Sequence, residues 1–403
     1  MGTGTDIGPQ RRVSTLDREL AARLDVLAAQ GLRRELRRVD SPIGPRVNLA
    51  GRTLLSFASN DYLGLASHPA LQDAAARAAR DWGAGSGASR LICGSLAPHL
   101  ELEESLAHFK GTDAALSFSS GYATAVGTLS ALLGKDDVVI LDKLVHACLV
   151  DGARLSGATI RVFRHNDLDR LESLLRWAQG RQSRALVVTE SVFSMDGDIA
   201  PLREIVTLKE RYGAWLLVDE AHATGVFGTL RRGLAEALGV SDHVEIQMGT
   251  LGKALGAAGG YIAGSRVLVD YLVNRARSFI FSTAPVPAQA AAATAALELM
   301  QSAEGAERCA RLWARIAQAG RACPRVATPA SAILPLILGA EDRAVAAAQA
   351  LLTEGFFVPA IRYPTVARGQ ARLRVSLSAA HTEADVDALG AALQSALQNL
   401  QTP

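Results

Sequence analysis

Cysteine, net charge and uninterrupted apolar stretches are all scarce in this sequence. Only four of its 403 residues are cysteine, and their spacing matches neither a paired metal site nor a disulfide framework. Forty-two basic against forty acidic residues give a formal charge of +2, which provides no broad field for nucleic acid or an anionic membrane. We therefore expect a cytoplasmic protein with no metal site and no nucleic-acid or membrane partner.

No segment has the character of a membrane span. The longest small-apolar run, residues 284–300, is interrupted by two prolines, a glutamine and a glutamate, so it predicts an alanine-rich buried helix. The first twenty residues carry arginines without a following apolar segment, and they predict no signal peptide. With 49% hydrophobic and 20% charged residues, the chain predicts one large core and a second, smaller one.

From about residue 115 the sequence alternates apolar runs with helical stretches. The continuous apolar runs are typical of strands covered on both faces, and they occupy 137–142, 185–190, 214–220, 244–250 and 259–264. This alternation predicts an α/β fold with a mostly parallel sheet. We expect an N-terminal helical segment over 1–45, a large α/β domain over 46–285 and a smaller α+β domain over 286–403.

One lysine, Lys253, stands among glycines and alanines in "QMGTLGKALGAAGG" directly after an apolar run. A phosphate-binding nucleotide loop would need Ser or Thr after this lysine, and Ala254 excludes that interpretation. A surface lysine on a flexible turn remains the simplest alternative for an isolated lysine. The residues at the ends of the other strands decide between these possibilities.

Asp219 follows the apolar run before that of Lys253, with one crossover-sized segment between them. Ligands of open parallel sheets bind at the carboxyl ends of the strands, so we expect both side chains at one edge. A lysine forms a Schiff base with the aldehyde of pyridoxal 5'-phosphate (PLP), and a carboxylate keeps its ring nitrogen protonated. Ser119, Ser120 and Gly121 precede a helical pattern whose N-terminus suits a phosphate. We therefore predict a PLP site.

Two histidines complete this prediction. His222 lies three residues after Asp219 and is expected to reach the hydroxyl oxygen of the cofactor ring. His146 follows another strand and is expected over the face of the ring. Each histidine alone is more often structural, but their places at strand ends beside Asp219 and Lys253 favour a functional role.

Eight motifs in order resemble the α-oxoamine synthases, a family of fold type I PLP-dependent transferases. They are "FASNDYLGLASHP" (57–69), "GAGSGASRLICGS" (83–95), "FSSGYA" (118–123), "HNDLDRLE" (165–172), "TESVFSMDGDIAPL" (189–202), "VDEAHATGVFG" (218–228), "GTLGKALG" (249–256) and "RYPTVARGQARLRVSLSAAHT" (362–382). The resemblance covers nearly the whole chain and implies the fold type I architecture.

The resemblance also implies roles for individual residues. Lys253 corresponds to the Schiff-base lysine, and the other catalytic positions are His146 and Asp219. The implied cofactor contacts are Gly121, Tyr122, His146, Ser194, Asp219, His222, Thr250, Lys253 and Thr283. Thr283 matches a residue offered to the phosphate of the neighbouring subunit, which implies a homodimer with shared sites. The implied substrate contacts are Arg33, Asn60, His146, Arg362 and Thr365, with Arg362 expected to bind a carboxylate.

Members of this family condense an amino acid with an acyl thioester and release carbon dioxide. The chain most resembles those that use L-alanine and a pimeloyl thioester in biotin biosynthesis. Departures occur at Tyr363, where a second proline is usual, and at Ala125, which replaces a common asparagine. A glycine-using acetyltransferase is the alternative within the family. A non-catalytic partner subunit is the alternative outside it, and the retention of Lys253 and Asp219 argues against that alternative.

Overall fold

The computed structural model describes residues 13–181, 184–323 and 329–399. The first twelve residues of the expected N-terminal segment, which include most of the stretch examined for a signal peptide, lie outside this range. So do the last four residues of the expected C-terminal domain. Among the described residues, no helix is both long and apolar enough to cross a membrane.

Helices occur throughout the described chain. In chain order they are α1 (Thr15–Ala29), α2 (Pro69–Trp82), the π-helical turn η1 (Arg90–Gly94), α3 (Ala97–Lys110), α4 (Gly121–Leu132), α5 (Ala147–Ser156), α6 (Leu168–Ala178), α7 (Leu202–Arg211), α8 (Leu234–Ala237), the 3₁₀ turn η2 (Ser241–His243), α9 (Arg266–Arg275), α10 (Arg277–Ile280), α11 (Pro287–Gln301), α12 (Ala303–Ala322), α13 (Glu341–Thr353) and α14 (Glu383–Asn399).

The strands fall into three sheets. In chain order they are β1 (Arg46–Leu49), β2 (Arg52–Ser56), β3 (Ala114–Phe118), β4 (Val138–Asp142), β5 (Thr159–Phe163), β6 (Ala185–Glu190), β7 (Trp215–Asp219), β8 (Ile246–Thr250), β9 (Gly260–Gly264), β10 (Ile333–Gly339), β11 (Phe356–Phe357), β12 (Ala360–Ile361) and β13 (Ala371–Ser376).

The largest sheet has seven strands in the order β3-β9-β8-β7-β6-β4-β5. The pairs β4–β5, β4–β6, β6–β7 and β7–β8 are parallel, whereas β9 runs antiparallel to both β3 and β8. The predicted α/β fold with a mostly parallel sheet is therefore confirmed. Each predicted run from 137 to 264 forms one strand of this sheet.

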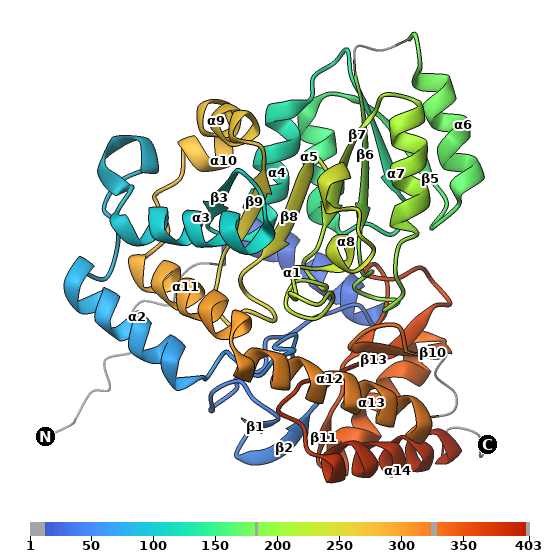
Figure 1. Ribbon diagram of the computed structural model, residues 1–403. Coiled ribbons are helices and arrows are strands. Elements are labelled where there is room, and N and C mark those ends of the chain that lie inside the picture. Colours follow the sequence, from blue (N-terminus) through green and yellow to red (C-terminus); the bar gives the residue numbers. More distant parts are fainter. Residues whose placement is uncertain (1–12, 182–183, 324–328, 400–403) are drawn as a thin grey trace, which may run out of the picture.

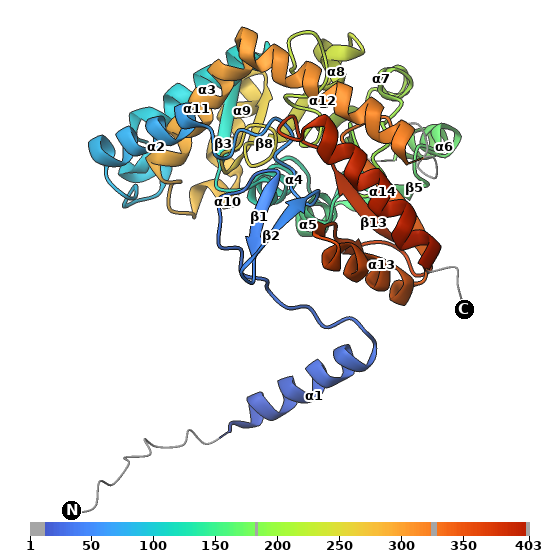
Figure 2. The same cartoon turned by 90° about the horizontal axis from the view of Figure 1, so that it is seen from below.

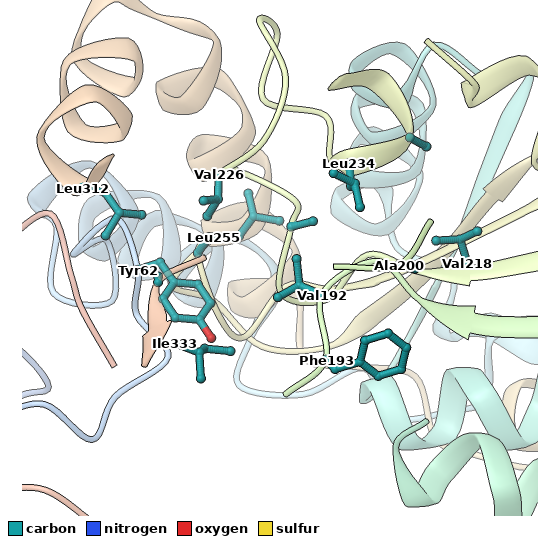
Figure 3. Close-up of a cluster of buried hydrophobic side chains, with 14 of the residues drawn as sticks. Tyr62, Val192, Phe193, Ala200, Val218, Val226, Leu234, Leu255, Leu312 and Ile333 are labelled. Carbon is teal, nitrogen blue, oxygen red and sulfur yellow. The ribbon is translucent and has the colours of Figure 1, made fainter. Parts of the chain in front are cut away.

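Both faces of this sheet are covered, which explains the continuous apolar runs. Along β4, Val138 and Ile140 belong to one buried cluster, whereas Val139 and Leu141 belong to another. The first cluster extends to α6, α7, α11 and α12. Figure 3 shows part of it, in which Tyr62, Leu255, Leu312 and Ile333 come from distant segments of the chain. The strands that lead to the expected site are thus anchored on two sides.

The second half of the chain builds a smaller sheet, β10-β13-β12, in which the neighbouring strands are antiparallel. Helices α13 and α14 lie beside it at the C-terminal end of the molecule (Figure 1). This arrangement agrees with the predicted α+β character of that region. The N-terminal hairpin β1–β2 also joins this part of the molecule, because β2 pairs with β11. The domain boundaries at residues 46 and 286 stay predictions.

Helix α1 begins at a capping box in which Ser14 and Asp17 exchange hydrogen bonds. None of its residues is buried, and Figure 2 shows it extending away from the rest of the chain. The expected N-terminal helical segment thus includes a helix that contributes nothing to the buried core.

Candidate active site

The carboxyl ends of four neighbouring strands meet at one edge of the large sheet. In the register of the sheet Glu190 pairs with Asp219, and Asp219 pairs with Met248. The side chains at the ends of β6, β7 and β8 therefore lie level with one another. His146 follows β4 at the same edge, and Lys253 follows β8 three residues after its last residue, Thr250.

Lys253 is the first member of a buried hydrogen-bonded chain. Its Nζ lies 2.7 Å from Nε2 of His222, and Nδ1 of His222 lies 2.6 Å from the hydroxyl of Tyr62. The Tyr62 hydroxyl donates to Oδ1 of Asn60 at 3.2 Å. This donor leaves the Tyr62 oxygen to accept from Nδ1–H of His222, so Nε2 accepts from the Lys253 amine. The direction of the chain fits an unprotonated imidazole at His222.

The electrostatics of this chain favour neutral groups. Burial lowers the pKa of Lys253, and nearby Arg374 lowers it further, whereas the carboxylates of Asp219 and Glu190 act in the opposite direction. Burial also lowers the pKa of His222 well below its usual range, and the Lys253 cation adds to that effect. Burial raises the pKa of Tyr62 to about 12. A neutral lysine amine is the form that acts as a nucleophile or as a base.

Asp219 presents one free oxygen to this site. Its Oδ1 accepts a hydrogen bond from the backbone N–H of Ala221 at 2.9 Å, while no residue in the described ranges donates to Oδ2. Burial raises the pKa of Asp219, and the Lys253 cation opposes this rise. A cationic N–H placed at Oδ2 would favour the carboxylate form in the same way.

Glu190 forms a second buried carboxyl beside Asp219. Its side chain accepts the backbone N–H of His146 at 2.5 Å and also the backbone N–H of Ser194. Burial, followed by the neighbouring Asp219 carboxylate, raises the pKa of Glu190 to about 8. Glu190 thus ties the loops after β4 and β6 to the end of β7.

His146 is the N-cap of α5, and its Nδ1 accepts the backbone N–H of Cys148 at 3.3 Å. His146 keeps solvent-exposed surface at the strand-end edge, while its Nδ1 side is partly covered by the protein. Burial lowers the pKa of His146, and the Lys253 cation lowers it further, against the carboxylates of Asp219 and Asp151. Nε2 has no hydrogen-bond partner within residues 13–181, 184–323 and 329–399, so it is available to a ligand.

The start of helix α4 supplies an anion-binding element. Ser120 caps this 12-residue helix by accepting the backbone N–H of Ala123, which leaves the first N–H groups of the helix to a ligand. The Thr250 hydroxyl lies close by, since it would be 3.9 Å from a Cβ on Gly121. The predicted contacts Gly121 and Thr250 are therefore neighbours.

Gly256 in the loop after Lys253 and Gly260 at the start of β9 stand where a larger residue would collide with the protein. Gly256 has φ of +63°, and a Cβ there would lie 2.5 Å from the backbone N of Ala66. At Gly260 a Cβ would meet the Thr124 hydroxyl at 2.5 Å and the Cα of Gly121 at 2.7 Å. Glycine thus allows the Lys253 loop to pack directly against neighbouring backbone.

Arg374 links the small sheet to this site. It stands on β13, is 5% exposed and donates to the carbonyl oxygen of Ser194 at 2.6 Å. Its Nη1 donates to Asn60 Oδ1 at 3.1 Å and to the Ser376 hydroxyl at 2.7 Å. The guanidinium also lies within hydrogen-bond reach of the Tyr62 side chain, so it is placed beside the chain of hydrogen bonds that begins at Lys253.

Three of the predicted substrate contacts lie elsewhere. Arg362 donates to the carbonyl oxygen of Gly31, and Thr365 accepts from Arg34 at 3.3 Å. The Arg33 side chain is 48% exposed, and its Nε lies 3.7 Å from Oε1 of Glu35. No hydrogen bond or ion pair within the described ranges connects Arg33, Arg362 or Thr365 to the Lys253 chain.

Two predicted cofactor contacts are also on the surface. Thr283 is exposed and forms an isolated bridge with Ser89, as a residue offered to another subunit would require. Tyr122 is 51% exposed and donates to Asp151 at 2.8 Å. Ser194 lies in the loop held by Glu190 and Arg374, beside the other site residues.

These groups fit PLP. The site offers an amine at Lys253, a free carboxylate oxygen at Asp219 for a ring N–H, a helix N-terminus for the phosphate and an exposed imidazole at His146 for the ring face.

Comparison with known proteins agrees with this fit. The family model of aminotransferase classes I and II matches residues 52–393. The 8-amino-7-oxononanoate synthase of Anaeromyxobacter dehalogenans (strain 2CP-1 / ATCC BAA-258) is 53% identical over 387 residues, covering 94% of this chain and 96% of its own. The chain belongs to the 8-amino-7-oxononanoate synthase family.

Solved structures of relatives share the fold of this family. A serine palmitoyltransferase variant from S. paucimobilis with bound PLP matches with a TM-score of 0.90 and 31% identity, over 98% of this chain and 100% of its own. The 8-amino-7-oxononanoate synthase from Francisella tularensis matches with a TM-score of 0.74 and 28% identity, over 86% and 98% of the two chains. The predicted fold type I PLP-dependent transferase is therefore confirmed.

Sequence reasoning did not single out Glu190, Arg374 and Tyr62. Glu190 could have been predicted as a site residue, because it is a carboxylate at the end of an apolar run that forms a strand. Arg374 could have been predicted as well, since an arginine inside the apolar run of β13 must find buried partners. Tyr62 lies within a quoted motif, but nothing in its local sequence indicates a bond to His222.

Proposed function

We propose that the protein condenses L-alanine with a pimeloyl thioester, carried by coenzyme A or acyl carrier protein, and releases 8-amino-7-oxononanoate, carbon dioxide and the thiol. This reaction places it in biotin biosynthesis, with PLP as cofactor, as a cytoplasmic homodimer. The observation that carries the proposal is the amine of half-buried Lys253, which has a lowered pKa and lies 2.7 Å from Nε2 of His222 at the strand-end edge.

PLP supplies an electron sink for the carbanion that forms at the α-carbon of alanine. When this cofactor is bound, Asp219 Oδ2 would hold the proton at its ring nitrogen, and the free N–H groups at the start of α4 would bind its phosphate. Ser194 and His222 would contact its ring oxygen, and His146 would cover its ring face. In the proposed dimer, Thr283 of one subunit reaches the phosphate of the other.

Lys253 Nζ removes the α-proton of alanine and later returns a proton to the product. His222 accepts a hydrogen bond from Nζ and so directs the lone pair of this amine. The lowered pKa of Lys253 favours the unprotonated amine that this step requires.

We assign the alanine carboxylate to Arg374, because its buried guanidinium lies beside Tyr62 at the site and its Nε and Nη1 are fixed by Ser194 and Asn60. The guanidinium holds this carboxylate until it leaves as carbon dioxide. Arg362 was the sequence-based choice for this role. With Arg33 and Thr365 it remains a proposed substrate contact, acting through the N-terminal segment that it binds.

His146 donates from Nε2–H to the carbonyl oxygen of the thioester. This bond strengthens as negative charge develops on that oxygen during attack by the α-carbon. The thiol then leaves, and decarboxylation gives the amino ketone.

A screen of amino acids against acyl thioesters tests the proposal, with thiol release and product mass recorded together. Pimeloyl-CoA with L-alanine should release thiol far faster than acetyl-CoA with glycine, and the product should have the mass of 8-amino-7-oxononanoate. A faster reaction with glycine and acetyl-CoA would assign the chain to the acetyltransferase activity instead. No thiol release with any pair would favour a non-catalytic subunit.

A further inference from the structure

One buried thiol lies against the candidate site. Cys148 is the second residue of α5 and is 3% exposed. Its Sγ lies 3.0 Å from Nδ1 of His146. Burial raises the pKa of Cys148, so the group is a thiol with one hydrogen to donate.

The backbone settles which group is the donor. The N–H of Cys148 donates to the same Nδ1 at 3.3 Å. Since a backbone N–H can only donate, Nδ1 carries no hydrogen and the thiol must donate to it as well. A neutral imidazole has one N–H, and in His146 that N–H is therefore at Nε2.

The remaining contacts hold His146 in this orientation. Glu190 accepts the backbone N–H of His146 at 2.5 Å, which fixes the residue at the start of α5. Nε2–H has no acceptor in the part of the chain that the structure describes. The ring thus presents a single, available donor at the strand-end edge.

We propose that Cys148 is a positioning residue whose thiol, by donating to Nδ1, keeps the proton of His146 at Nε2 and aims that N–H at the substrate carbonyl. The inference rests on the proposed function for the identity of the carbonyl, but its structural part concerns His146 alone. Nothing in the sequence alone indicates a role for Cys148.

Several charged groups surround the ring, and they set how its protonation responds to a variant. Lys253 opposes protonation of His146, while Asp219 and Asp151 favour it. Glu190 faces the backbone N–H of His146, and Cys148 faces Nδ1. The two donors at Nδ1 stabilise only the neutral ring, because a protonated Nδ1 cannot accept. Loss of the thiol should therefore make the imidazole easier to protonate.

Nitrogen-15 NMR of the full chain, labelled at the histidine rings and loaded with PLP, tests this inference. His146→Asn identifies the His146 signals by their loss. We expect an unprotonated Nδ1 and a protonated Nε2 in the unmodified protein. Cys148→Ala should raise the pH at which the His146 ring protonates, and Cys148→Ser should restore the original value through its hydroxyl donor.

Cys323→Ala is the matched control, since Cys323 is also buried but is not bonded to the site residues. It should leave the His146 signals unchanged. A proton at Nδ1 in the unmodified protein would overturn the inference. So would a Cys148→Ala protein whose His146 titrates like that of the unmodified one.

The kinetic consequence is modest, because a neutral hydrogen bond contributes about 0.5–1.5 kcal/mol and a thiol is a weak donor. We expect Cys148→Ala to lower kcat about two- to fivefold, with recovery in Cys148→Ser. Normal NMR behaviour with no condensation of any substrate pair would refute the proposed function while leaving the role of Cys148 intact.

Discussion

The residues around Lys253 and those around Arg362 are held in different ways. Lys253, His222 and Tyr62 form a buried chain in which each polar atom has a partner at 2.6–2.7 Å. Arg362 is bound by the single carbonyl of Gly31, and Arg33 is 48% exposed. Both regions contain residues predicted for the site. The comparison indicates that the large sheet fixes the chemical groups in place, whereas residues 31–34 and 362–365 are joined by few hydrogen bonds.

The largest expected effect is that of Lys253→Ala. The variant loses the amine that moves the α-proton, so turnover should fall by at least about 10²–10⁴-fold. Steady-state thiol release measures this change. Lys143→Ala is the control, because Lys143 is an exposed lysine that follows the neighbouring strand β4. If turnover falls equally in Lys253→Ala and Lys143→Ala, Lys253 is not the amine that moves the α-proton.

Asp219→Asn should have the next largest effect. The amide cannot stabilise a protonated ring nitrogen, so we expect a loss of about 10²–10³-fold in kcat. PLP should still bind through Lys253 and the start of α4, which absorbance of the dialysed protein would show. Near-normal turnover in Asp219→Asn would mean that this carboxylate is structural.

Arg374→Lys and Arg362→Lys compare the two regions directly. Lysine cannot reproduce the fork of hydrogen bonds to Asn60, Ser194 and a ligand carboxylate, so Arg374→Lys should raise KM for L-alanine about ten- to a hundredfold. Arg362 is half-buried and has one carbonyl partner, so its replacement should change this KM by about fivefold at most.

Thermal unfolding of both variants provides the control for folding, because Arg374 also ties β13 to the loop after β6. If the two variants are equally stable and KM for L-alanine rises more in Arg362→Lys than in Arg374→Lys, Arg362 is the residue that binds the alanine carboxylate.

The stability of the fold should depend on pH through Glu190. The pKa of Glu190 is about 8 in the folded protein and about 4.3 in an unfolded chain. Between these values the folded state binds more protons, so stability should fall as pH rises from about 4.5 to 8. Glu190→Gln should lessen this fall, as urea midpoints across that range without PLP would show. An unchanged pH dependence would mean that the Glu190 carboxyl does not retain its proton.

The strand-end cluster could be predicted from sequence because parallel strands bring their carboxyl ends to one edge. Continuous apolar runs located β4, β6, β7 and β8, and the polar residues at the ends of these runs were then predicted to lie at the site. The length of α8 was less accessible, since the helix-sized segment between β7 and β8 contains a helix of only four residues, Leu234–Ala237.

Contacts made across long sequence separations were not accessible. Arg374 reaches Asn60 and Ser194 only because β13 packs beside the loop after β6, and no local pattern encodes that placement. The pairing of β2 with β11 joins residues about 300 positions apart for the same reason. Arg362 was predicted to bind the carboxylate because it lies in a family motif. A motif gives the type of residue at a position but does not show whether that residue is buried at the site.

Reduction of the PLP-loaded protein with borohydride, followed by digestion and mass spectrometry, tests the central claim most directly. The reduction makes the bond between a lysine and the cofactor permanent, so the labelled peptide identifies the lysine. We expect the label on the peptide that contains Lys253. A label on Lys143 or on any other lysine would contradict the assignment of this site.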